Sequence, residues 1–298
     1  MGDTQAAFIA IVGKPNVGKS SLLNRLIGAK IAIVTNKPQT TRMRISGVLT
    51  TGKMQFVFTD TPGLCKPKTQ LGNYMVSQVF KSISDVDLVA FVAEAIGDKI
   101  ASSELTLLNE IQKQKQKVIL ILSKIDKLKD KSKILHRMEL FKTEYDFSEI
   151  IPVSAFTGDG IADLLNVFES YSTKGPHFFP EGSVTNQPEK FIVAEIVRER
   201  ILMNLSEEVP HSVAVVTEKI KKRSKSELID IDVHILCDKK NHKGIIIGKN
   251  GEMLKKIATE SRLEIVFFLG RKVNLQCWVK VKEGWRNKKQ LFESLGLT

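Results

Sequence analysis

The chain has 298 residues, which exceeds the usual size of one domain, so two domains are expected. Its formal net charge is +12 and the excess is uneven: residues 190–298 carry 22 basic and 14 acidic side chains, a surplus typical of a module that binds a polyanion. No apolar run approaches the roughly 20 residues of a membrane span, residues 1–7 lack the basic start of a secretory signal, and three widely spaced cysteines fit reduced thiols of a cytosolic protein.

Short apolar runs alternate with amphipathic stretches through the first 171 residues. Two strands flanking Thr51-Gly52 read as a hairpin, and helical patterns lie between the other strands. The expected strands cover residues 7–12, 44–50, 54–59, 87–92, 118–122 and 150–153, and the helices 20–27, 102–115, 132–145 and 161–171. This alternation predicts an α/β fold with a mostly parallel six-stranded sheet covered on both faces.

The pattern lapses after residue 172, where prolines and glycines interrupt small and polar residues. We therefore predict an N-terminal domain at residues 1–174, a linker at 175–189 and a C-terminal domain at 190–298. In the last of these we expect a helix, two strands, a helical stretch around a glycine-rich turn, and a strand. Their ranges are 191–205, 212–220, 228–236, 243–261 and 273–281.

A glycine-rich motif follows the first predicted strand and opens the first predicted helix. It satisfies GxxxxGK[ST] in full, in the context that a phosphate-binding loop requires. The glycines let successive backbone N–H groups point at phosphate oxygens. We expect the charge of Lys19 near the β- and γ-phosphates and the Ser20 hydroxyl on Mg²⁺. The predicted nucleotide-binding residues here are Gly13, Lys14, Pro15, Asn16, Val17, Gly18, Lys19, Ser20 and Ser21.

Two further segments are predicted to complete the phosphate and metal site. Asp60-Thr61-Pro62-Gly63 follows an apolar strand, and a carboxylate at the end of a strand suits a Mg²⁺ contact. The backbone N–H of Gly63 is expected to approach the γ-phosphate. In the loop at residues 36–42, Thr41 is the first choice for a second hydroxyl ligand and Thr40 the alternative. The predicted metal ligands are therefore Ser20, Thr41 and Asp60.

Base recognition is predicted at the end of the strand at residues 118–122, in Ser123-Lys124-Ile125-Asp126. The carboxylate of Asp126 can accept hydrogen bonds from guanine N1–H and N2–H₂, which adenine lacks; hydrogen bonds to charged groups are worth about 1.5–3 kcal/mol. The stem of Lys124 is expected over the base. Ser123 stands where nucleotide-binding loops of this type carry Asn, so its reach to both the base and the phosphate loop is in question. Ser154-Ala155 is expected to offer a backbone N–H to guanine O6.

The C-terminal part contains a GxxG turn between two helical patterns. With the order helix, strand, strand, helix, helix, strand, it resembles a type II KH domain. Such glycines let a single-stranded RNA backbone approach closely, and Lys249 would face phosphate. Apolar residues Ile245–Ile247 and strand residues such as Ile231 and Val233 are expected on the floor of a base-binding groove. The predicted RNA-binding residues are Ile247, Gly248, Lys249, Asn250 and Gly251.

These motifs, in this spacing and followed by this module, together cover nearly the whole chain and resemble the Era family of translation-factor-related P-loop GTPases. The resemblance implies GTP/GDP and Mg²⁺ as ligands, and a switch that binds the 3′ end of small-subunit (16S) ribosomal RNA and assists maturation of the small subunit. It also implies a cytoplasmic location with peripheral contact to the inner face of the membrane. A monomer is expected.

Hydrolysis is expected to be slow, because Leu64 stands where many small GTPases place a water-orienting Gln. The expected catalytic groups are Lys19, Thr41, Gly63 and Asn16, the last as the site of a K⁺ ion that the resemblance suggests. Residues 33–43 and 64–73 are expected to order with GTP and loosen after hydrolysis. The alternatives are an ATPase or nucleotide kinase, against which Asp126 argues, and an RNA-binding protein that uses nucleotide structurally without significant turnover, which Leu64 keeps open.

Overall fold

The computed structural model describes residues 4–64, 67–224 and 226–294, so Cys65 and Lys66, within the predicted segment 64–73, lie outside it. The described residues form two compact units. The N-terminal unit lies within Met1–Ala32, Thr41–Pro67 and Gly72–Asn186, and the C-terminal unit within Ile33–Thr40, Lys68–Leu71 and Gln187–Thr298. Each unit has its own sheet and core.

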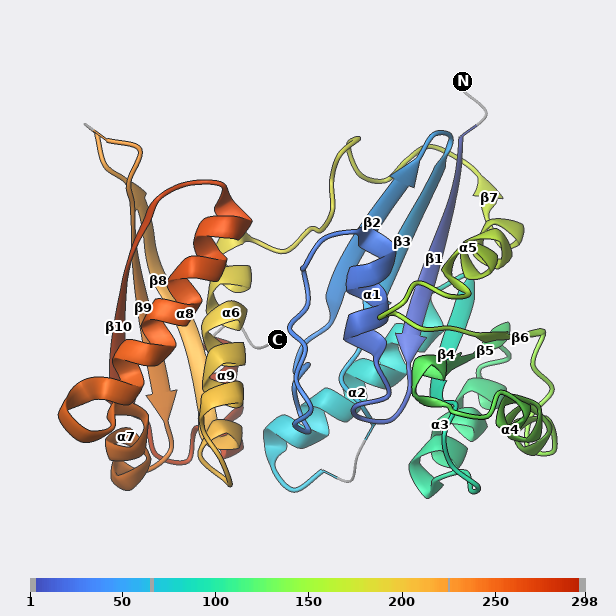
Figure 1. Ribbon diagram of the computed structural model, residues 1–298, viewed down its shortest axis with the longest axis horizontal. Coiled ribbons are helices and arrows are strands. Elements are labelled where there is room, and N and C mark those ends of the chain that lie inside the picture. The colour runs from blue at the N-terminus through green and yellow to red at the C-terminus, as the bar shows by residue number, and fades with distance from the viewer. Residues whose placement is uncertain (1–3, 65–66, 225, 295–298) are drawn as a thin grey trace. The chain divides into compact units, whose positions relative to one another are not determined.

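The N-terminal unit is built on a sheet whose main path is the predicted six strands (Figure 1). They are β1 (Gln5–Val12), β2 (Ile45–Thr51), β3 (Met54–Asp60), β4 (Leu88–Glu94), β5 (Val118–Ser123) and β6 (Glu149–Pro152). Their order is β2-β3-β1-β4-β5-β6, and β2 alone on this path runs antiparallel to its neighbour. A short seventh strand, β7 (Thr173–Lys174), pairs antiparallel with β1. The predicted mostly parallel α/β sheet is therefore confirmed.

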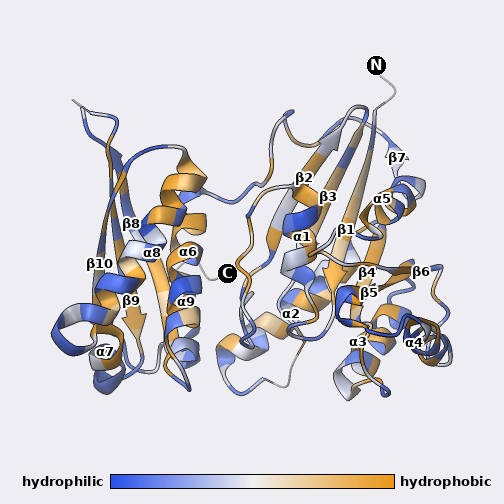
Figure 2. Cartoon of the chain, viewed as in Figure 1, coloured by the Kyte–Doolittle hydropathy of each residue, from blue (hydrophilic) through white to orange (hydrophobic). Residues whose placement is uncertain are grey.

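Helices cover both faces of this sheet, as the buried runs of its strands require. One face carries α1 (Lys19–Ile27) and α5 (Ile161–Ser170), the latter packing Phe168 against Phe58 at a ring-centroid distance of 5.5 Å. The other carries α2 (Gln70–Ser84), α3 (Ser102–Lys113) and α4 (Ser132–Lys142), which share one apolar cluster with β4 and β5. In Figure 2 these two strands are coloured as hydrophobic, matching their almost complete burial.

Helix α2 was not predicted, because the start of this stretch was interpreted as a polar switch loop. Leu71, Met75, Val79 and Ile83 recur every four residues and are all buried, so a helical signal was present. Gly72 and the polar residues before it obscured the helix start. The last residues of the predicted segment 64–73 are thus the first turn of α2.

The segment predicted as a linker is anchored along most of its length to the N-terminal unit. The buried amide of Gln55 accepts hydrogen bonds from Phe178 N (2.7 Å) and Phe179 N (2.9 Å) and donates to Phe179 O (2.9 Å). Further on, Val48 N donates to Val184 O at 2.9 Å, and Gly47 forms a bridge with Thr185. Val184 and Thr185 therefore lie against β2, and Phe178 and Phe179 are held by a side chain of β3.

The C-terminal unit folds one face of a three-stranded sheet against helices. Its elements are α6 (Glu189–Asn204), β8 (Val213–Lys222), β9 (Ile229–Cys237), α7 (Lys240–Ile247), α8 (Glu252–Leu269), β10 (Val273–Val281) and α9 (Lys289–Ser294). The strand order is β10-β9-β8, with β9 parallel to β10 and antiparallel to β8. An apolar cluster joins the sheet to α6, α7 and α8. This is the predicted helix–strand–strand–helix–helix–strand order.

Ile231 and Val233 were assigned wrongly to a groove floor. Burial alternates along β9, so these two side chains face the helices and are fully buried in the core. No helix among the described residues is both long and apolar enough to cross a membrane.

Replacing Gln55 with Leu should lower the free energy of unfolding by about 1–3 kcal/mol, because two backbone N–H groups lose their buried acceptor. Chemical denaturation measures this change. Amide hydrogen exchange should show loss of protection at Phe178 and Phe179 and not at Val48, whose N–H donates to Val184 O and is untouched by the substitution. Unchanged protection at the first two amides would contradict the anchoring of this segment.

Candidate nucleotide and RNA sites

The phosphate-binding motif forms a tight loop between β1 and α1. Gly13 has φ +154°, and a Cβ at this position would lie 2.3 Å from Val92 O, so only glycine fits. Gly18, at φ +100°, immediately precedes α1. The Lys19 amine donates to Lys14 O (2.9 Å) and Gly13 O (3.2 Å), which holds its charge inside the loop. The loop thus has the shape and charge for a polyphosphate at a helix N-terminus.

Asp60-Thr61-Pro62-Gly63 lies directly against this loop. Thr61 Oγ1 donates to Ile11 O at 3.0 Å, and Leu64 N donates to Gly13 O at 3.3 Å. A Cβ on Gly63 would lie 2.6 Å from Pro15 N and Cα, so a larger residue here would push the two segments apart. The glycine keeps its backbone beside the phosphate loop.

Three oxygen-bearing side chains meet at the end of β3. Ser20 Oγ donates to Asp60 Oδ2 at 2.6 Å and lies 2.9 Å from Thr41 Oγ1, which is itself 3.3 Å from the same carboxylate oxygen. Thr40 differs: its hydroxyl donates to Lys37 O within its own loop. The structure therefore places Thr41, the first choice, beside Ser20 and Asp60.

This cluster fits a hard divalent cation such as Mg²⁺. Asp60 is fully buried, and its Oδ1 is one of the buried atoms that lack a hydrogen-bond partner in the described structure. Burial raises the pKa of Asp60, while Lys19 and the hydroxyls of Ser20 and Thr41 oppose that rise. A cation bound by Oδ1 and the two hydroxyls would compensate the buried charge.

The predicted base-binding loop is joined to the phosphate loop by two side chains. Ser123 Oγ lies 2.5 Å from Val17 O and 3.0 Å from Ala93 O, so the shorter serine does reach the phosphate loop. Lys124 Nζ donates to Asn16 O at 2.5 Å. The exposed Asp126 accepts a 2.6 Å hydrogen bond from Ser154, which brings the Ser154-Ala155 loop to the same place.

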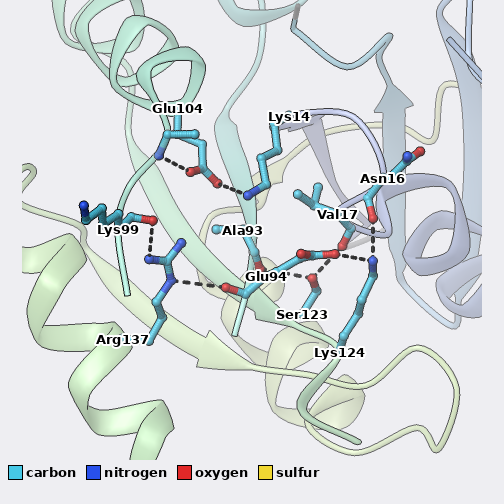
Figure 3. A network of polar contacts seen from close by, with 12 residues as sticks. Lys14, Asn16, Val17, Ala93, Glu94, Lys99, Glu104, Ser123, Lys124 and Arg137 are labelled. Carbon is cyan, nitrogen blue, oxygen red and sulfur yellow. Dashed lines mark hydrogen bonds and ion pairs between the residues drawn. The ribbon is translucent and has the colours of Figure 1, made fainter. Parts of the chain in front are cut away.

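Sequence reasoning missed a charged network behind these loops (Figure 3). Glu94, at the end of β4, pairs with Lys124. Glu104, fully buried at the start of α3, lies 3.5 Å from Lys14 Nζ.

Arg137 on α4 donates to the backbone oxygens of Glu94 and Lys99. Burial lowers the pKa of Arg137, and the carboxylates of Glu104, Asp98 and Glu94 oppose this. The position of Glu94 at a strand's carboxyl end was the available signal.

Leu64 turns away from the phosphate loop. Its side chain is buried in the apolar cluster formed by β4, β5 and their helices. It therefore offers no group to orient a water molecule, in line with the reasoning from its chemistry.

The GxxG turn connects α7 to α8 in the C-terminal unit. Gly248 (φ 74°, ψ 176°) ends α7, and Gly251 (φ 80°) precedes α8. A Cβ on Gly248 would lie 2.7 Å from Met253 Cβ, so the turn is closed by close packing. Lys249 and Asn250 between them are exposed, whereas Ile247 packs against the core. The exposed pair is open to an RNA backbone.

Two family models match the chain. One, described as a 50S ribosome-binding GTPase, covers residues 8–124, and the other, described as a KH domain, covers residues 208–286.

Curated relatives match over nearly the whole length. GTPase Era of Clostridioides difficile is 43% identical over 292 residues, covering 98% of each chain, and GTPase Era of Clostridium perfringens is 45% identical with the same coverage. A crystal structure of an Aquifex aeolicus Era variant bound to GDP·AlF₄⁻ superposes with a TM-score of 0.94 at 37% identity, covering 99% of this chain and 100% of that one. A structure of Era with MgGDPNP and nucleotides 1506–1542 of 16S ribosomal RNA has the same TM-score and identity and covers 99% of each chain.

Replacing Asp60 with Asn should impair Mg²⁺ binding without lowering the stability of the metal-free protein. The folded pKa of Asp60 lies above its unfolded value, so its contribution to stability is present at acid pH and is lost as pH rises through the folded pKa. At neutral pH the buried charge destabilises the folded protein. The metal-free, nucleotide-free Asp60→Asn variant should therefore be at least as stable as the wild type.

The same substitution should abolish the rise in thermal midpoint that Mg²⁺ adds in the presence of GDP, measured by calorimetry with and without EDTA. Retention of the full Mg²⁺ effect in Asp60→Asn would exclude this carboxylate as a metal ligand.

Proposed function

Because this chain belongs to the Era family of GTPases, we propose that it is a GTP-hydrolysing switch that binds the 3′ end of 16S ribosomal RNA and assists maturation of the small ribosomal subunit. The observation that carries the nucleotide half of the proposal is the convergence of three sequence motifs on one loop. Gly63 packs on Pro15, Lys124 binds Asn16 O and Ser123 binds Val17 O.

Guanine selectivity is assigned to Asp126. Its carboxylate is exposed and is oriented by the hydroxyl of Ser154, so it can accept hydrogen bonds from a base. Lys124 is held along the phosphate loop by Asn16 O and Glu94, which leaves its aliphatic stem to cover the base. Ser123 supplies the link between the two loops that a longer Asn would supply.

Hydrolysis is assigned to positioning and charge rather than to a general base. Ser20, Thr41 and Asp60 would hold Mg²⁺, which neutralises charge on the β- and γ-phosphates when bound. Lys19 adds a fixed positive charge, and the backbone N–H of Gly63 approaches the terminal phosphate. Since Leu64 is buried in the core, a slow intrinsic rate follows. A K⁺ ion at Asn16 remains part of the proposal, and equal rates in Na⁺ and K⁺ buffers would reject it.

RNA binding is assigned to the GxxG turn and the basic C-terminal unit. The turn presents Lys249 and Asn250 to solvent between two glycines, a geometry that admits a phosphate backbone. The description of the N-terminal family model mentions the 50S subunit, but that model covers only residues 8–124. The full-length relative bound to 16S RNA therefore guides the choice of RNA.

We assign residues 1–174 to the GTPase domain and 190–298 to the KH domain, with residues 175–189 between them. We propose a monomer in the cytoplasm, with peripheral contact to the inner face of the membrane. Support for the location comes from the family resemblance and from Cys237 and Cys277, which are free thiols.

Replacing Asp126 with Asn should change base preference from guanosine to xanthosine triphosphate, because an amide can donate to the O2 of xanthine but cannot accept from both guanine donors. Loss of the charged acceptor should weaken GTP binding at least about tenfold. Competition binding with GTP, ATP and XTP measures the shift. Asp130→Asn is the matched control, since that exposed carboxylate accepts hydrogen bonds from Ser132. Unchanged GTP selectivity in Asp126→Asn would contradict the assignment of Asp126.

Replacing Lys249 with Gln should weaken binding to a 16S 3′-end oligonucleotide at low salt. It should also reduce the slope of log Kd against log salt by about 0.7, the value for one phosphate contact on a single strand. Lys113→Gln, an exposed ion-paired lysine on α3, serves as control. An identical slope in Lys249→Gln and wild type would remove the turn from the RNA site.

A further inference from the structure

Phe156 is the most exposed large hydrophobic residue among the described residues of the N-terminal unit, at 87%. Single exposed apolar residues are common on protein surfaces and indicate nothing by themselves. Phe156 differs from them by its position. It directly follows Ser154-Ala155, the loop whose serine hydroxyl donates to the carboxylate of Asp126 in the proposed base site.

The loop that carries Phe156 is held in one shape by its own hydrogen bonds. Ser154 Oγ accepts from Thr157 N at 3.1 Å, and Ser154 O accepts from Gly158 N at 2.8 Å. The loop is closed at its far end, since Ser154 N donates to Asp159 O at 2.9 Å. Phe156 lies inside this closed turn, so its backbone position does not depend on a ligand.

Two sides of the loop are already occupied. A Cβ on Gly158 would lie 2.2 Å from the guanidinium of Arg25 on α1. On the side of β6, a Cβ on Gly160 would lie 2.1 Å from Pro152 O. A ring that is 87% exposed packs against neither neighbour. It therefore projects into solvent at the carboxyl edge of the sheet, where the carboxylate of Asp126 is also exposed.

The ring of Phe156 is within reach of a base held by Asp126. The hydroxyl of Ser154 lies 2.6 Å from Asp126 Oδ1. Ser154 and Phe156 are two residues apart, so their Cα atoms are separated by at most about 7 Å. A purine bonded to the exposed carboxylate lies on the solvent side of this contact. The phenyl ring, which projects from the same loop, can therefore pack on that purine.

An aromatic ring supplies affinity that the polar groups of the site do not supply. Bases stack on aromatic side chains whatever their hydrogen-bonding edge, because every base has a π face. Lys124 provides a second apolar surface, since Asn16 O and Glu94 hold its amine (Figure 3) and leave its stem beside the base site. Lys124 follows β5 and Phe156 follows β6, which are adjacent strands, and Asp126 lies between them in the chain.

We propose that Phe156 is a base-contacting residue of the nucleotide site: its ring packs on the guanine and forms, with the stem of Lys124, the apolar walls of the base pocket. The inference rests on the proposed function, since it assumes a guanine held by Asp126. It divides base recognition between two residues. Asp126 selects guanine through hydrogen bonds, whereas Phe156 adds affinity for any purine that occupies the pocket.

The test compares GDP and inosine diphosphate, which lacks the exocyclic amine of guanine and keeps both rings. Calorimetry measures the affinity of each nucleotide for the wild type, Phe156→Leu and Phe156→Ala. Phe156→Ala should weaken the binding of both nucleotides by the same factor, about tenfold, the size expected for one base stacked on an aromatic ring. Phe156→Leu should lie between Phe156→Ala and the wild type, because it keeps apolar area and loses the ring.

Phe267→Ala is the matched control. Phe267 lies on α8 of the C-terminal unit and is 88% exposed, and its replacement should leave both affinities at the wild-type value. Since Phe156 is exposed, the nucleotide-free Phe156→Ala variant should unfold at the wild-type midpoint. Should that variant fail to fold, Phe156→Leu decides the question.

A fluorescence measurement on Phe156→Trp gives a readout independent of affinity. The chain has two other tryptophans, Trp278 and Trp285, whose emission is subtracted with the wild-type spectrum. GDP should quench the emission of the introduced indole, because a purine stacked on an indole quenches it. Inorganic phosphate, which has no base, should leave that emission unchanged.

Three results decide between the inference and the proposed function. Wild-type affinity for both nucleotides in Phe156→Ala, with no quenching in Phe156→Trp, would overturn the inference and leave the proposed function intact. A loss confined to GDP would also overturn it, because Phe156 would then act only by orienting Asp126. A wild-type protein that binds neither GDP nor inosine diphosphate would instead overturn the proposed function.

Discussion

The nucleotide site is built around a fully buried carboxylate, one of whose oxygens has no hydrogen-bond partner among the described residues. Asp60 lies at the end of β3. Its Oδ2 accepts a hydrogen bond from Ser20 and lies close to Thr41 Oγ1, whereas Oδ1 is among the described buried atoms without a hydrogen-bond partner. Such a group raises the free energy of the folded protein unless a cation approaches. The site is therefore arranged for a ligand that supplies positive charge. Lys19, held on the phosphate loop's own carbonyls, places a second positive charge nearby.

Parallel strand order explains why distant motifs meet. β1, β3, β4 and β5 are neighbours in one sheet, so their carboxyl ends open onto the same edge. The phosphate loop follows β1, Asp60 ends β3, Glu94 ends β4 and Ser123 ends β5. Short polar contacts then hold the loops together at this edge. Gly13 and Gly63 are required because backbone fills the space where a side chain would lie.

Helix α6 of the C-terminal unit carries a buried polar stripe, formed by Glu195, Arg198 and Glu199, in addition to the apolar residues that pack in the core of the unit. A helix that only supported the KH sheet would need the apolar stripe alone. The polar stripe binds backbone groups of residues 33–40. Backbone contacts of this kind hold a loop in place whatever its side chains.

Much of this protein could be read from its sequence because the signals are local. A strand, a glycine loop and a helix in succession predict a phosphate site, and the type and order of the later motifs predict the base, the metal and the RNA module. Helix α2 was missed because Gly72 and the polar residues before it hid a four-residue apolar repeat. Ile231 and Val233 were misplaced because alternation shows that a strand has two faces and does not show which face the helices cover.

Contacts between residues far apart in the chain could be assigned only from the tertiary structure. Only folding brings Glu104 to Lys14, Glu94 to Lys124 and Gln55 to the segment once expected to be a free linker. Ser123 could be judged only once the 2.5 Å distance to Val17 O was known. The same holds for residues 33–40, which belong to one domain by sequence and to the other by packing. Chain order records covalent neighbours, whereas the free energy of these contacts depends on distance and burial in three dimensions.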